Sequence, residues 1–76
     1  MKDKYYVQYR DLGLSVSYFR KARGLTQQQL AEKMDINYET ISRIETANTG
    51  ISTDMLFELG KALEISLGEL FNHAKL

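Results

Sequence analysis

Residues 23–45 read RGLTQQQLAEKMDINYETISRIE and predict two short helices joined by a tight turn. Counted from Gln27, the fifth residue is the small Ala31 and the ninth is Asp35, which falls between the two helices. Isoleucines follow at positions fifteen and eighteen, on one face of the second helix. A small residue lets two helices cross closely, Asp tolerates left-handed dihedrals, and the isoleucines bury the inner face of the second helix. This spacing therefore predicts a rigid two-helix unit.

Helix starts recur at four places in the chain. At each place an apolar residue precedes a Ser, Thr or Asn cap, and a second apolar residue follows four positions after the cap; the apolar pairs are Leu25 with Leu30, Ile36 with Ile41, Ile51 with Leu56, and Ile65 with Leu70. The cap oxygen satisfies an orphan amide, and the apolar pair packs across the first turn. Gln29 and Glu69 complete two capping boxes. We therefore expect helices over residues 27–34, 38–47, 53–63 and 67–72.

A further helix precedes these four. Its inner face is an apolar stripe at spacings of three and four residues, formed by Tyr9, Leu12, Val16 and Phe19. We expect the helix to end near Arg23, with Gly24 as a left-handed cap. Because Gly13 weakens a helix interior, we expect a start between residues 11 and 15, with Asp11 favoured. Residues 1–10 either extend this helix or form an N-terminal arm, and residues 11–76 form one domain with its two-helix unit at about 27–47.

The composition indicates a single soluble domain. The 76 residues include no cysteine and no proline, which excludes disulfides and cysteine-based zinc sites and leaves no sign of a linker. No apolar run approaches the ~20 residues of a membrane span, and the first residues do not resemble a signal peptide, so we expect a cytoplasmic protein. The formal net charge is zero, which argues mildly against nucleic-acid binding, yet residues 1–25 carry six basic and only two acidic residues.

Three stretches together resemble the phage-repressor and Cro-like (Xre-type) helix-turn-helix family of bacterial transcriptional regulators. They are RGLTQQQLAEK (residues 23–33), ISRIE (residues 41–45) and KALEISLGELF (residues 61–71). The resemblance runs from about residue 12 to residue 71 and implies an all-α, five-helix, lambda-repressor-like DNA-binding domain. The chain departs from the family in carrying Asp35 where glycine is common, and in a loop over residues 46–50 that lacks basic residues.

The resemblance also implies a DNA-binding site. In this family the helix that begins after Asn37 lies in the major groove of duplex DNA, with its first residues at the base edges. The DNA-binding residues that we expect are Thr26, Gln27, Asn37, Tyr38, Glu39, Thr40, Ser42, Arg43, Thr46 and Asn48. Arg43 suits guanine, Glu39 suits the cytosine amino group, and Thr40 or Tyr38 suits the thymine methyl group.

Several of these residues also have structural interpretations. Thr26 and Asn37 are helix caps before they are phosphate contacts, and Glu39 and Arg43 stand four residues apart, as in a simple surface ion pair. Gln27 matches a family position that contacts the DNA backbone and braces the recognition helix. Arg20 and Glu45, on the first and third helices, match a family pair that we interpret as structural.

We therefore expect a transcriptional regulator, either a repressor or an activator, that binds a near-palindromic operator as a homodimer through its C-terminal helices. A phage-type repressor, a restriction-modification controller and an antitoxin all fit. The C-terminal apolar residues either face the second protomer or cover the core of one; they are Phe57, Leu67, Leu70, Phe71 and Leu76. The alternative is a protein-interaction module of the same fold that does not bind DNA.

An enzyme is not expected. His73 is the single histidine, and the chain has no glycine-rich phosphate loop and no paired carboxylate motif. We accordingly predict no catalytic residue, metal ligand, cofactor or small-molecule ligand, and double-stranded DNA as the partner.

Overall fold

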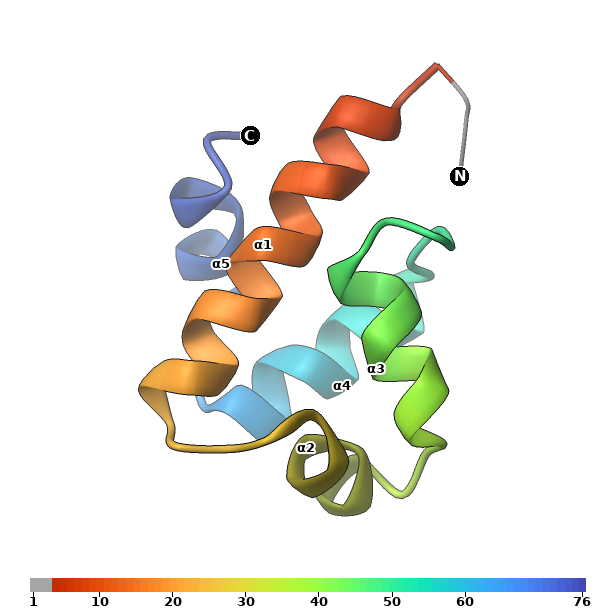
Figure 1. Ribbon diagram of the computed structural model, residues 1–76. Coiled ribbons are helices and arrows are strands. Elements are labelled where there is room, and N and C mark those ends of the chain that lie inside the picture. The colour runs from red at the N-terminus through yellow and green to blue at the C-terminus, as the bar shows by residue number, and fades with distance from the viewer. Residues whose placement is uncertain (1–3) are drawn as a thin grey trace.

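A computed structural model, which describes residues 4–76, contains five helices and no strand. They are α1 (Tyr6–Ala22), α2 (Gln27–Met34), α3 (Tyr38–Glu45), α4 (Thr53–Leu63) and α5 (Leu67–His73). Helix α1 runs along most of the molecule, with α5 on one side of it and α3 on the other, while α2 closes the lower end (Figure 1). The start of α1 and the C-terminus lie together at the upper end of this view (Figure 1). The all-α, five-helix prediction is confirmed.

Local hydrogen bonds begin the four later helices where the sequence predicts. The Thr26 hydroxyl accepts from the Gln29 amide at 3.0 Å, and the Gln29 side chain accepts from the Thr26 amide at 2.9 Å. Ser66 and Glu69 form the second capping box. Asn37 and Ser52 cap α3 and α4 with single side-chain bonds. Both predicted capping boxes are therefore confirmed.

The favoured start of α1 is wrong, and the alternative that the N-terminal residues extend the helix holds for residues 6–10. The helix begins at Tyr6 rather than between residues 11 and 15, so residues 6–10 belong to α1. Gly13 lies inside the helix, at the point where α1 packs directly against the end of α3. A β-carbon on Gly13 would overlap the carbonyl oxygen of Ile44 and lie 3.1 Å from that of Glu45. The glycine thus permits close helix packing, and any arm formed by residues 1–3 lies outside the described residues.

Residues with left-handed backbone dihedral angles lie where the helices end. Gly24 has φ of 72° and Asp35 has φ of 56°, as predicted for the ends of α1 and α2. Helix α3 ends at Glu45, two residues earlier than predicted, because Ala47 turns the chain with φ of 58°. Helix α5 extends to His73, one residue beyond the prediction.

One hydrophobic core connects all five helices. It is formed by the buried residues Leu12, Val16, Leu30, Ala31, Ile41, Ile44, Leu59, Ala62, Leu63, Leu70 and Ala74. Ile41 and Ile44 are 0% and 2% exposed, so the inner face of α3 is fully packed against the rest of the molecule. Its opposite face is therefore held at a fixed orientation. The described residues include no helix with the length and hydropathy that a membrane crossing requires.

Candidate nucleic-acid interface

The two-helix unit, residues 27–45, is closed by a short turn with regular backbone bonds. The Asp35 amide donates to the Glu32 carbonyl at 3.2 Å, and the Ile36 amide donates to the Ala31 carbonyl at 3.0 Å. These bonds satisfy carbonyl groups at the end of α2 that have no partner within the helix. Ala31 is 1% exposed, as expected of a small residue where helices cross. The turn therefore fixes α3 relative to α2.

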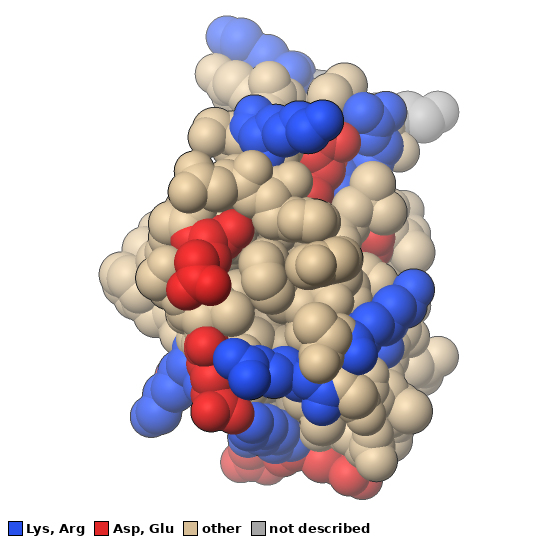
Figure 2. Space-filling view, turned by 90° about the vertical axis from the view of Figure 1, so that its left-hand side faces the viewer, with Lys and Arg blue, Asp and Glu red and all other residues tan. Residues whose placement is uncertain are grey.

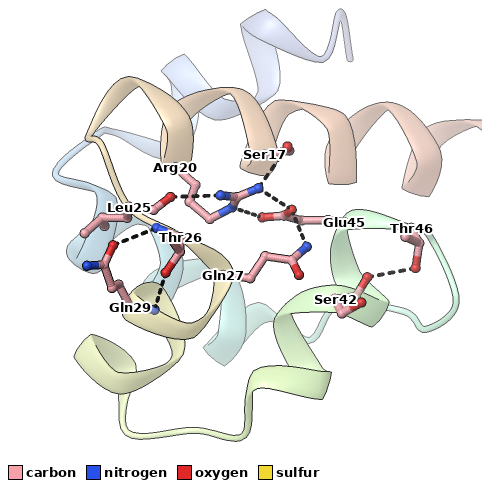
Figure 3. Close-up of polar contacts among 9 residues, drawn as sticks. All are labelled: Ser17, Arg20, Leu25, Thr26, Gln27, Gln29, Ser42, Glu45 and Thr46. Atoms are coloured by element: carbon pink, nitrogen blue, oxygen red, sulfur yellow. Dashed lines mark hydrogen bonds and ion pairs between the residues drawn. The ribbon is translucent and has the colours of Figure 1, made fainter.

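A buried ion pair joins α1 to α3 (Figure 3). Arg20 Nε donates to Glu45 Oε2 at 2.7 Å, and Arg20 Nη2 donates to Glu45 Oε1 at 3.0 Å. Arg20 Nη1 also donates to the Leu25 carbonyl at 2.8 Å, just before α2. The two side chains are only 10% and 5% exposed. The structural pair predicted between Arg20 and Glu45 is thus present, and one guanidinium ties three segments together.

Gln27 completes this network from the first turn of α2. Its Nε2 donates to Glu45 Oε1 at 2.9 Å, so the Glu45 carboxylate accepts from α1 and α2 at once (Figure 3). The side chain is partly buried. Gln27 therefore contacts the end of α3 in the way that the predicted brace requires, and its contact with a DNA backbone stays a prediction.

The outer face of α3 is polar and accessible. Tyr38 is 45% exposed, Glu39 and Arg43 are exposed, and Thr40 and Ser42 are half-buried. Glu39, Ser42 and Arg43 lie on the side of α3 away from the buried isoleucines, and Tyr38 and Thr40 flank that side, as the helical spacing predicts. The structure thus brings these five predicted site residues together on one surface.

Glu39 and Arg43 form an ion pair across one turn of this surface. Arg43 Nη2 lies 3.3 Å from Glu39 Oε2, and the side chains are 61% and 63% exposed. Exposed pairs of this kind contribute only about 0.3–0.5 kcal/mol to helix stability. The pair therefore has little effect on the fold, and it places the Arg43 guanidinium beside Glu39.

Thr46 and Asn48 hold the chain where α3 ends. Thr46 Oγ1 donates to the Ser42 carbonyl at 2.8 Å, which Figure 3 shows, and Asn48 Nδ2 donates to Thr46 Oγ1 at 2.9 Å. The Asn48 amide also donates to the Arg43 carbonyl at 2.8 Å. Both side chains are exposed, yet each already has a role in closing α3.

Thr26 and Asn37 lie at the first turns of α2 and α3. Each side chain is exposed and accepts a backbone amide bond of 3.0 Å from its own helix. Their cap role is therefore observed. Helix starts expose further amide donors and carry partial positive charge, which suits a phosphate oxygen.

The two-helix unit is acidic. Residues 27–45 include two basic and four acidic residues. Of the basic residues, Lys33 lies 3.7 Å from Glu64 and Arg43 is paired with Glu39. Of the six basic residues within residues 1–25, most lie on α1 or just after it. This surface therefore presents few cations, and both are paired with acidic side chains.

Sequence reasoning missed two positioning residues. Arg23 Nε donates to the Leu63 carbonyl at 2.7 Å and Arg23 Nη2 donates to the Glu64 carbonyl at 2.9 Å, so Arg23 caps the end of α4. Ser15, buried within α1, donates to the Leu70 carbonyl at 2.7 Å. A serine beside the apolar stripe of α1 was the only sequence signal for the second contact.

Comparisons with known proteins agree with this geometry. A family model described as helix-turn-helix matches residues 16–70. A curated relative, the competence pilus inhibition repressor of Acinetobacter baylyi, is 39% identical over 61 residues, which are 80% of this chain and 56% of the relative. The chain thus spans about half the length of that relative.

Two solved regulators share the fold. The clp gene regulator ClgR of Corynebacterium glutamicum has a TM-score of 0.85 at 25% identity, with 90% of this chain and 88% of that one covered. The restriction-modification controller protein C.AhdI of Aeromonas hydrophila has a TM-score of 0.85 at 26% identity, with 91% and 100% covered.

Proposed function

The chain belongs to the helix-turn-helix family of DNA-binding transcriptional regulators, and from this premise we propose that it binds a specific duplex DNA sequence and represses transcription. The observation that carries the proposal is the exposed polar face of α3, which the core and the Arg20–Glu45 pair hold rigidly. The family consists of regulators rather than enzymes, and the curated relative is named a repressor.

Helix α3 enters the major groove in this proposal, because a groove about 12 Å wide admits one α-helix. Arg43 donates to guanine O6 and N7, and Glu39 accepts from a cytosine amino group. Tyr38 and Thr40 contact a thymine methyl group, and Ser42 contacts a base edge or the sugar beside it.

Phosphate groups are held on both sides of α3. The amides at the start of α2, with Thr26 and Gln27, bind one phosphate, because the first turn of a helix carries amide donors without a partner in the helix and partial positive charge. Asn37, which caps the start of α3, is a separate candidate for a phosphate contact. Thr46 and Asn48 bind a further phosphate where α3 ends, because their hydrogen bonds already order the loop there.

We further propose that two protomers associate through the C-terminal helices and bind a near-palindromic operator. A groove of about 260 Å³ lies between the start of α1, the start of α4 and the end of α5; its apolar lining is Tyr5, Tyr9, Leu12, Ile51, Leu56, Phe71 and Leu76. Leu76 is 52% exposed and Phe57 is 59% exposed, whereas Leu70 is fully buried.

The face of the molecule over α1 and α5 carries few charges at its middle that would repel a second protomer (Figure 2). The middle of this face is largely uncharged, with charged side chains above and below it and an acidic side chain beside it (Figure 2). A two-fold dimer presents two α3 helices to half-sites about 34 Å apart along the duplex.

The second candidate is a protein-interaction module of the same fold. It is favoured by the acidic balance of residues 27–45, because phosphate neutralisation supplies much of the affinity for DNA. A module of this kind binds no duplex selectively, so DNA binding separates the two candidates.

The test is selection of bound sequences from a random duplex pool, followed by affinity measurements across a range of salt concentrations. A DNA-binding regulator enriches a near-palindromic motif and loses affinity steeply as salt rises. Arg43→Ala relaxes the preference for guanine at one position of each half-site, by about 1–3 kcal/mol. Lys33→Ala is the matched control, because Lys33 is paired with Glu64 away from the outer face of α3. A pool that yields no enriched motif would favour the interaction module.

Association is tested by analytical ultracentrifugation of Leu76→Glu. The exposed position tolerates the charge in a monomer, so the variant shifts toward monomer and binds the full operator more weakly. Leu14→Glu is the control, because Leu14 is 58% exposed and does not line the groove. If Leu14→Glu dissociates the dimer and Leu76→Glu does not, the interface lies on α1 and not on the C-terminal helices.

A further inference from the structure

Among the described residues, Arg43 forms one ion pair, with Glu39 on the outer face of α3. The pair is too exposed to stabilise the fold appreciably. We propose that Glu39 is a positioning and specificity residue for Arg43, so that the two side chains act as one unit that reads a single G·C base pair. This inference rests on the proposed binding of duplex DNA.

The contact geometry leaves Arg43 able to bind a base while it is held. Only Nη2 of the guanidinium contacts the carboxylate, at 3.3 Å, and an arginine side chain carries five N–H donors. A bidentate contact with guanine O6 and N7 needs two of them. Glu39 can therefore orient the guanidinium during base contact without being displaced.

The donor and acceptor pattern of a G·C pair matches that of the ion pair. In the major groove this base pair presents two guanine acceptors, N7 and O6, and then one cytosine donor, the N4 amino group. Arg43 supplies donors for the guanine, and the Glu39 carboxylate supplies the acceptor for the neighbouring amino group. No other arrangement of a base pair offers two adjacent acceptors followed by a donor.

A phosphate group fits the pair poorly. A phosphate offers only acceptors and a full negative charge, which the Glu39 carboxylate repels at short range. A lone arginine at this position would bind phosphates and guanines alike. Glu39 thus lowers non-specific affinity and raises the preference for one base pair.

The decisive experiment repeats the pool selection with wild-type protein, Glu39→Gln, Arg43→Ala and the double variant. The amide of Glu39→Gln keeps the size of the side chain and removes its charge. We expect Glu39→Gln and Arg43→Ala to lose the G·C preference at the same operator position, by about fivefold or more. The double variant then loses no more at that position than Arg43→Ala alone, because the two residues act together.

Non-specific binding supplies an independent measurement. In Glu39→Gln the guanidinium is free to contact a phosphate, so affinity for unrelated duplex rises. The slope of log affinity against log salt becomes steeper by about one unit. Glu32→Gln is the matched control, because Glu32 is an exposed acid of the same two-helix unit whose recorded side-chain bond is to Gln28. It removes the same charge but keeps the G·C preference and the wild-type salt slope.

The outcomes separate the two levels of the proposal. If wild-type protein enriches no motif, the proposed function fails and the inference fails with it. If it enriches a motif that Glu39→Gln retains unchanged, the inference alone is overturned. It is also overturned if Glu39→Gln and Arg43→Ala lose preference at different base pairs, or if Glu32→Gln changes the G·C preference as much as Glu39→Gln. Circular dichroism of each variant confirms that the helices are intact.

Discussion

Gly13→Ala tests the contact that places α3 on the body of the molecule. Helix propensity alone predicts that alanine stabilises the interior of α1, by about 1 kcal/mol. The structure predicts the opposite. The added β-carbon would overlap the carbonyl oxygen of Ile44 and lie 3.1 Å from that of Glu45, and both are backbone atoms that cannot rotate away.

The size of the effect follows from these two terms. Overpacking a tight contact costs about 1–3 kcal/mol, and a clash with backbone on a buried residue belongs near the upper end. After subtraction of the propensity gain, the free energy of unfolding falls by about 2 kcal/mol. For a domain of this size, that lowers Tm by about 8–16 °C. Operator affinity falls as well, because the displaced segment carries the end of α3.

Thermal and urea denaturation followed by circular dichroism measure this change. Gly68→Ala is the control, because a β-carbon there meets only the Ser66 hydroxyl, at 3.6 Å. That variant gains about 0.5 kcal/mol from reduced chain entropy. If Gly13→Ala is as stable as wild type, or more stable, the close approach of α1 to α3 does not exist in the folded protein and the reasoning is refuted.

Three further substitutions test the two-helix unit. Glu45→Ala leaves the buried Arg20 charge without its partner and lowers the free energy of unfolding by about 3–5 kcal/mol in urea denaturation. The double variant Arg20→Met with Glu45→Leu restores most of this stability. Equal losses in the single and the double variant would contradict an ion-pair role. Asp35→Gly relieves a left-handed φ of 56° and raises stability by about 0.5 kcal/mol in the same assay, and a loss of stability would show that the Asp35 side chain contributes a contact of its own. Thr26→Ala removes the cap of α2 and lowers the free energy of unfolding by about 1 kcal/mol. Thr26→Ser is the control, because serine keeps the capping hydroxyl. An alanine variant as stable as wild type would show that the capping box is dispensable.

Local chemistry in the sequence determined the later helices and the outward face of the candidate site. The cap bonds of Thr26, Asn37, Ser52 and Ser66 each join residues two or three positions apart, so their signals can be found without knowledge of the fold. The same holds for the helical spacing that buries the isoleucines of α3 and turns Arg43 outward. The family resemblance follows from the three sequence stretches at residues 23–33, 41–45 and 61–71, taken in order.

Only the tertiary structure decided where α1 begins and what holds α3 in place. From the sequence, Gly13 favoured a helix start nearby. The structure shows that a glycine is required there because the backbone of Ile44, distant in the sequence, packs against it. The same applies to the bonds from Gln27 to Glu45 and from Arg23 to the end of α4. Contacts between residues distant in sequence leave no periodic or local signal, because they exist only once the packed core has brought the helices together.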